Sequence, residues 1–246
     1  MNSVKILING IAGAGKTSLL STLGEETFVV SRDAKKFGLE IPHLMVDEYV
    51  DMHTLIEGEG GIVPTMEKYH KKFNRYPENV AIDSVSQITM DVIDKASQTP
   101  NVYGSQGAEI TKEMAMLVKF IHEDLELNGI NVILLNHVIP EKDEGKETGA
   151  YTQFGQGKFL AKGGFYAATN EALTVVPSGN NRVVYMRGTD KQARTTLNDL
   201  PDKMYVENYL DPTKSRKLKD GEVHFNLKEH IERLVESQVK VGSWSL

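Results

Sequence analysis

Three glycines, a lysine and two hydroxyl residues lie close together near the start of the chain. Residues 10–18 read Gly-Ile-Ala-Gly-Ala-Gly-Lys-Thr-Ser and directly follow an apolar run. Glycines let backbone N–H groups wrap around phosphate oxygens, and a helix that begins here adds its positive N-terminal end. Lys16 is expected to reach the β- and γ-phosphates, and the Thr17 hydroxyl to bind Mg²⁺. This spacing is that of a P-loop and predicts a nucleoside-triphosphate site. The predicted nucleotide-binding residues are Gly10, Ala12, Gly13, Ala14, Gly15, Lys16, Thr17 and Ser18.

A second apolar run, residues 79–82, ends in Asp83 and Ser84. After a P-loop this is the Walker B arrangement, in which the carboxylate holds Mg²⁺, often through water. Thr17 and Asp83 are therefore the predicted metal-binding residues. The alternative is that Asp83 caps the helix that follows, a role for which Ser84 competes.

These motifs need strands to carry them and helices to cover the strands. Apolar runs and helical periodicity predict an α/β fold, with a mostly parallel sheet and the P-loop at the carboxyl end of a strand. The expected strands are 4–9, 27–31, 43–50, 79–84 and 131–135, with a β-hairpin over 173–186. The expected helices are 18–23, 65–73, 85–96, one from about 110 to 128, and a last one that Asn226 and Glu229 begin as a capping box.

Length and composition indicate an ordinary folded protein. The 246 residues favour a core over residues 1–210, with a basic turn and a helix over 211–246 packed on it or appended to it. A net charge of −6 argues against a globally basic protein that coats nucleic acid, and the absence of cysteine excludes disulfides and thiolate metal sites. We expect no signal peptide, no membrane span and a cytoplasmic location.

Two segments are polar and glycine-rich. Residues 99–107 form a predicted loop with one aromatic residue, Tyr103, and residues 140–164 form the longest stretch for which no regular structure is predicted. The second stretch interleaves lysines with aromatic residues, a composition that suits single-stranded nucleic acid because lysines contact phosphates and rings stack on bases. The alternative is a solvated loop that contacts nothing.

The order of these parts, over about residues 4–194, resembles the RecA-like ATPase core. Within that superfamily the short chain is most similar to phage-encoded RecA-like single-strand annealing proteins. The resemblance implies a P-loop NTPase with helices flanking a mostly parallel sheet, and a β-hairpin toward the C-terminal part. It also implies ATP and Mg²⁺ as ligands, and a host-cell cytoplasmic location if the protein is phage-encoded.

The resemblance further implies roles for single residues. Asp33 takes the place of the carboxylate that activates water, with Glu48 as the second candidate, and the alternative for Asp33 is an ion pair with Arg32. His137 takes the place of a polar γ-phosphate sensor, and the alternative is that it merely caps its strand.

Two cations complete the set that the resemblance implies. Arg194, and with it Lys191, lies where family members project cations into the neighbouring subunit's nucleotide. The alternative is a pair of surface cations. The predicted catalytic residues are Lys16, Asp33, Asp83, His137 and Arg194.

The expected function is Mg²⁺-dependent ATP hydrolysis coupled to single-stranded DNA. The resemblance places DNA contacts in residues 99–107 and 141–164, and annealing or recombination in a homo-oligomeric ring or filament. One alternative is a small-molecule kinase, against which the absence of arginine between residues 141 and 164 argues. The others are a nucleotide-switched interaction protein without DNA binding, and a ring of the replicative-helicase or circadian-clock type.

Overall fold

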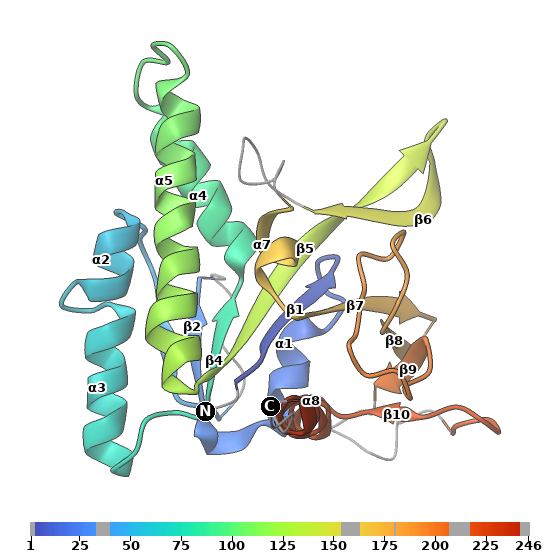
Figure 1. The fold of residues 1–246 in the computed structure, drawn as a ribbon. Helices are drawn as coiled ribbons and strands as arrows, with labels where there is room; N and C mark the ends of the chain where they lie inside the picture. The colour runs from blue at the N-terminus through green and yellow to red at the C-terminus, as the bar shows by residue number, and fades with distance from the viewer. Residues whose placement is uncertain (1–2, 33–39, 154–162, 180, 207–216, 242–246) are drawn as a thin grey trace.

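The computed structural model describes residues 3–32, 40–153, 163–179, 181–206 and 217–241. Within these residues ten strands form one twisted sheet with helices on both faces (Figure 1). The strand order is β10-β9-β8-β7-β1-β5-β4-β2-β3, with β6 paired to β5. The strands are β1 (Lys5–Gly10), β2 (Thr27–Ser31), β3 (His43–Met45), β4 (Asn79–Asp83), β5 (Asn131–Asp143), β6 (Lys146–Gln153), β7 (Glu171–Ser178), β8 (Asn181–Tyr185), β9 (Lys203–Val206) and β10 (His224–Phe225).

The central strands run parallel, from β7 through β1, β5, β4 and β2 to β3. The pairs β7–β8, β8–β9 and β5–β6 are antiparallel. The predicted α/β class, the mostly parallel central sheet and the β-hairpin toward the C-terminal part are therefore confirmed.

Side chains of the central strands alternate between two hydrophobic cores. On β1, Leu7 faces one core while Ile6 and Ile8 face the other. The first core contains α2 (Met52–Glu57), α3 (Ile62–Phe73), α4 (Val85–Ser97), α5 (Ser105–Lys119), the π-helical stretch η3 (Phe120–Leu125) and α7 (Gly164–Ala168). The second contains α1 (Lys16–Leu19), η1 (Leu20–Thr22) and α8 (Leu227–Val241). Strands buried on both faces explain why the sequence shows continuous apolar runs.

The prediction of an irregular stretch over residues 140–164 is wrong for its first part. β5 continues to Asp143, and a two-residue turn returns the chain as β6. Glu144 and Gly145 both have positive φ, 47° and 79°, which is the backbone that tight hairpin turns require. Glu144-Gly145 lacks the usual Asn or Asp, so the sequence gives a weak hairpin signal. Residues 154–162 lie outside the described part.

Other boundaries also differ from the predictions. The expected strand 43–50 is β3, which ends at Met45, and α5 begins at Ser105, so that the last three residues of the predicted loop 99–107 are helical. The short elements α2, β9 and β10 were not predicted, because elements of two to six residues leave little periodicity to read.

The last helix begins after Asn226, at the predicted position. The Asn226 side chain accepts hydrogen bonds from the backbone N–H groups of Lys228 and Glu229. Leu227, Ile231 and Leu234 of α8 are buried in the second core, and β10 pairs with β9. β10 and the buried face of α8 therefore pack with the same sheet as the P-loop strand.

Candidate functional site

The P-loop connects the carboxyl end of β1 with the first turn of α1, as predicted. A Cβ atom at Gly10 would lie 2.8 Å from the carbonyl oxygen of Val175, so the neighbouring strand β7 requires glycine there. Gly15 has φ +89°, which also favours glycine. Ala12 and Gly13 are exposed, so this part of the loop lies at the surface, where a ligand can reach it.

The Lys16 ammonium lies over this loop. Its Nζ donates hydrogen bonds to the carbonyl oxygens of Gly10 and Ile11, at 2.8 and 3.1 Å. The same atom lies 3.3 Å from Nδ1 of His137. Lys16 is only 5% exposed, so its charge is fixed at the loop by acceptors that an anionic phosphate oxygen would outcompete.

The side chains of Thr17, in α1, and Asp83, at the end of β4, contact each other. Thr17 Oγ1 donates to Asp83 Oδ2 at 2.6 Å, and Asp83 is buried. Asp83 is not the cap of α4, because the Ser84 hydroxyl accepts from the backbone N–H of Gln87. A hydroxyl and a carboxylate side by side are the oxygen ligands that Mg²⁺ takes alongside phosphates. The pair therefore fits the predicted metal, and these are the residues that would hold it.

His137 reaches the site because of the sheet order. β5 lies between β1 and β4, and its register places His137 opposite Gly10. The backbone N–H of His137 donates to Ser86 Oγ at 2.5 Å. The residue thus lies beside Lys16, between the P-loop strand and the strand that ends in Asp83, and its role as a sensor stays a prediction.

A buried polar chain underlies these groups and was not predicted. Ser86 Oγ donates to Asn136 Oδ1 at 2.8 Å, and Asn136 Nδ2 donates to Asn9 Oδ1 at 2.9 Å. Asn9 Nδ2 in turn donates to the carbonyl oxygen of Gln192 at 3.0 Å. The signal in the sequence was an asparagine at the end of each of two otherwise apolar strands. The chain connects α4, β5 and β1 with the loop that carries Lys191.

Of the two candidates for the water-activating carboxylate, only Glu48 lies among the described residues. Asp33 lies outside the described residues and stays a prediction, and Glu48 is exposed after β3. Arg32, the alternative partner of Asp33, forms an ion pair with Asp91 of α4, with Nε 2.7 Å from Oδ2.

Both predicted trans-acting cations contact their own chain. The Arg194 guanidinium donates to the carbonyl oxygens of Tyr166 and Thr169 and lies 4.3 Å from the centroid of the Tyr166 ring. Lys191 Nζ donates to the carbonyl oxygen of Gly149, in β6. The polar chain described above ends at Gln192, the residue after Lys191. The roles of Arg194 and Lys191 toward a neighbouring subunit stay predictions.

The segments predicted to bind DNA extend from the same side of the sheet. Figure 1 shows the α4–α5 turn and the β5–β6 hairpin projecting beyond the carboxyl ends of the central strands. Tyr103 is fully exposed in the α4–α5 turn, with the neighbouring Val102 also exposed.

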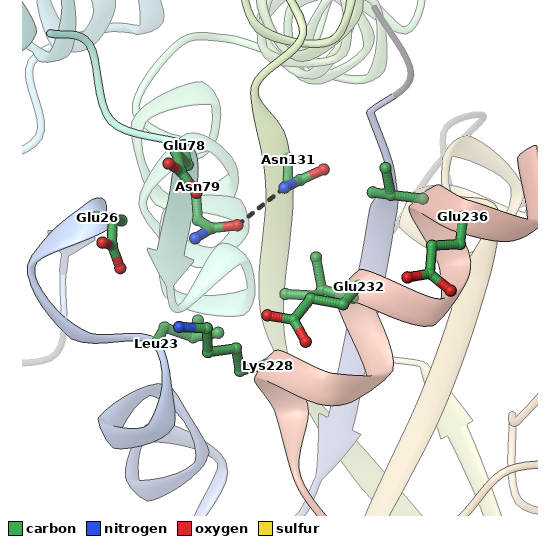
Figure 2. A pocket seen from close by; sticks show the side chains of 10 residues that line it. Leu23, Glu26, Glu78, Asn79, Asn131, Lys228, Glu232 and Glu236 are labelled. Carbon is green, nitrogen blue, oxygen red and sulfur yellow. Dashed lines mark hydrogen bonds between the residues drawn. The ribbon is translucent and has the colours of Figure 1, made fainter. Parts of the chain in front are cut away.

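A cavity of about 320 Å³ lies elsewhere, at the amino ends of β4 and β5. Figure 2 shows Glu26, Glu78, Glu232 and Glu236 around it, with Lys228 as the one cation among its lining residues. An acidic lining repels phosphate, so this cavity is no nucleotide site.

A known domain family matches the greater part of the chain. The AAA_24 model, described as an AAA domain, matches residues 2–161. The chain belongs to the AAA_24 family. This match covers the P-loop, Asp83 and His137, and the protein is accordingly a nucleotide-binding domain of the ATPase class.

No curated protein matches this AAA domain. Among solved structures it is similar to one titled "Crystal structure of the RadB recombinase", with a TM-score of 0.46 and 14% identity, over 82% of this chain and 86% of that chain.

In the described part of the chain, no helix is both long and apolar enough to cross a membrane.

Proposed function

We propose that this AAA domain is a Mg²⁺-dependent ATPase of the RecA-like class that binds single-stranded DNA and promotes annealing or recombination as a homo-oligomer. One observation carries the proposal. β5 is a single strand that bears His137 beside Lys16 and, six residues later, ends at the tip of the projecting hairpin. A nucleotide-dependent shift at His137 would therefore be transmitted along one continuous strand, past the register shift between Pro140 and Lys142, to an exposed surface.

In the proposed reaction the chain's own groups bind and orient the triphosphate. The P-loop amides bind phosphate oxygens, and Lys16 exchanges its carbonyl partners for the β- and γ-phosphates. Thr17 and Asp83 would hold Mg²⁺, which when bound neutralises charge on the phosphate oxygens. His137 would donate a hydrogen bond to the γ-phosphate and register its loss after hydrolysis.

The proposed DNA contacts are the α4–α5 turn and the β5–β6 hairpin with the residues that follow it. Exposed Tyr103 offers a ring on which a base can stack. Residues 141–153 carry four carboxylates and two lysines, so phosphate contacts from this part are few. We therefore expect weak binding with a shallow dependence on salt.

Assembly is the remaining part of the proposal. For Arg194 or Lys191 to reach a neighbouring subunit's nucleotide, each must exchange its carbonyl partners within its own chain for phosphate oxygens. The guanidinium of Arg194 suits bidentate phosphate binding, so it is the stronger candidate. Electron microscopy with ATP and single-stranded DNA is expected to show rings or filaments, and a persistent monomer would contradict a trans role.

Fluorescence anisotropy with a labelled single-stranded oligonucleotide tests the DNA part. We expect binding that ATP strengthens and salt weakens. Tyr103→Ala should weaken it several-fold, whereas Tyr76→Ala, which removes an exposed tyrosine after α3, should not. Absence of salt-sensitive binding with and without ATP would overturn DNA binding while leaving ATP hydrolysis standing.

The carboxylates of the hairpin favour one second candidate, a nucleotide-switched interaction protein that binds a basic protein surface through the hairpin. The same anisotropy experiment separates the two proposals, because this candidate predicts no DNA binding. It further predicts very slow phosphate release by a chain that binds ATP tightly.

A further inference from the structure

Arg182 lies on the P-loop, although it belongs to the distant hairpin β7–β8. β7 runs beside β1, with Val175 opposite Gly10, and the hairpin continues past the carboxyl end of β1 to the turn before Arg182. The guanidinium lies against Gly15: a Cβ atom at this glycine would be 2.5 Å from both Cζ and Nε of Arg182. Gly15 thus leaves space for the arginine as well as adopting a positive φ.

Arg182 also differs from the other arginines in the described part of the chain. There Arg32, Arg75 and Arg233 pair with carboxylates, while Arg187 and Arg194 donate to backbone carbonyl oxygens. For Arg182 no hydrogen bond or ion pair to another described residue is found, and the residue is exposed. An unpaired guanidinium held at an anion-binding loop is a ready donor for an anion.

We propose that Arg182 binds the diphosphate portion of the nucleotide held by its own chain. The inference rests on the proposed nucleotide site. P-loop amides cradle the α- and β-phosphates, and Gly15 directly precedes Lys16, which reaches the β- and γ-phosphates. A guanidinium lying on Gly15 therefore faces the α- and β-phosphates, and its planar fork matches two phosphate oxygens.

This assignment makes a distinctive prediction about ligand class. The α- and β-phosphates are common to ADP and ATP, so Arg182 contributes to the affinity for both to the same extent. A contact with the γ-phosphate, by contrast, would favour ATP alone. Because Arg182 acts within its own chain, its contribution does not depend on assembly, unlike the role predicted for Arg194.

Isothermal titration of the full chain with ADP and with ATP in Mg²⁺ tests the inference. Arg182→Ala is expected to raise the Kd of both nucleotides about tenfold, and Arg182→Lys to recover part of the loss. Arg75→Ala is the matched control, since it removes the same charge from an exposed site and should leave both Kd values unchanged. Equal melting temperatures would show that the variants fold.

The outcomes separate this inference from the proposed function. If the wild type binds and Arg182→Ala binds as tightly, Arg182 is no nucleotide ligand and only this inference falls. If Arg182→Ala weakens ATP but not ADP, the assignment to the diphosphate is wrong. If the wild type binds neither nucleotide, the proposed function falls and the inference falls with it.

Discussion

The two ends of the central strands both carry buried polar side chains, but they use them differently. At the amino ends, Asn131 accepts from the backbone N–H of Val4 and donates to Asn79, which donates to Thr27. These side chains satisfy one another and the starts of four neighbouring strands. At the carboxyl ends, Lys16 donates to carbonyl oxygens of the glycine-rich loop and lies 3.3 Å from a nitrogen of His137.

The candidate site is therefore recognised by its hydrogen-bond donors and positive charge rather than by the volume of a cavity. The 320 Å³ cavity at the amino ends is lined by four glutamates and one lysine (Figure 2). The carboxyl ends instead hold two cations, Lys16 and Arg182, at a glycine-rich loop. Only the second arrangement suits a polyphosphate.

The largest expected effect is on ATP affinity. It is seen by comparing two single lysine substitutions, one at each end of the central strands. Lys16→Ala removes the charge that contacts the β- and γ-phosphates and should raise the Kd of MgATP by about 100-fold or more, or about 2.7 kcal/mol. Lys228→Ala, at the acidic cavity, should leave it unchanged. Isothermal titration measures both. Weaker ATP binding by Lys228→Ala, with normal binding by Lys16→Ala, would place the nucleotide at the amino ends of the strands and contradict the proposed site.

The next largest effect comes from two adjacent residues, Asp83 and Ser84, of which the first should affect turnover and the second stability. Asp83→Asn keeps the shape of the side chain but removes its charge, and should lower Mg²⁺-dependent phosphate release about 100-fold, or about 2.7 kcal/mol. Ser84→Ala removes the cap of α4 and should cost about 1 kcal/mol of stability with near-normal turnover. Turnover that survives Asp83→Asn would remove Asp83 from the metal site.

A third comparison uses the asparagines of the two ends. Asn131→Ala leaves the buried N–H of Val4 unpaired and should cost about 1–3 kcal/mol of unfolding free energy, without changing nucleotide affinity. Asn136→Ala breaks the chain from Ser86 to Asn9 beside His137 and should lower both stability and turnover. Urea unfolding and phosphate release measure the two quantities. Equal effects of both substitutions on turnover would refute the functional distinction between the ends.

The smallest effect is a pH dependence at the amino end. Burial tends to raise the pKa of Glu126, but hydrogen bonds from Lys5 and His122 outweigh it and hold this pKa below its usual value of 4.5. The stabilisation is therefore present above about pH 4.5 and is lost as the pH falls through the lowered pKa. Glu126→Gln should be less stable than the wild type at pH 7, and the gap should narrow at pH 3–4 in urea melts. A gap that widens on acidification would contradict this assignment.

Much of the nucleotide site could be predicted from sequence because its parts are local. The P-loop spans residues 10–18, and the residue types of Thr17 and Asp83 at strand ends suffice to propose a metal site, which the structure then brings within 2.6 Å. The order of the strands within the sheet was not predicted, yet this order is what places His137 beside Lys16.

The remaining features depend on contacts between distant segments. Arg182 reaches Gly15 over 167 positions of sequence through the β7–β8 hairpin, and no local pattern marks that meeting. The hairpin of β5 and β6 was missed because Glu144-Gly145 is an uncommon turn pair. The ion pair between Arg32 and Asp91 could not be predicted from the sequence either, because it depends on how α4 packs beside β2.

Hydrogen–deuterium exchange of the intact chain, with and without MgATP, reports directly which residues the bound nucleotide protects. We expect MgATP to slow exchange in peptides covering residues 10–20 and 83–88, with no change in peptides covering 227–238. Lys16→Ala should abolish this protection. Protection confined to residues 227–238, with the P-loop unaffected, would contradict the assignment of the nucleotide to the carboxyl ends of the strands.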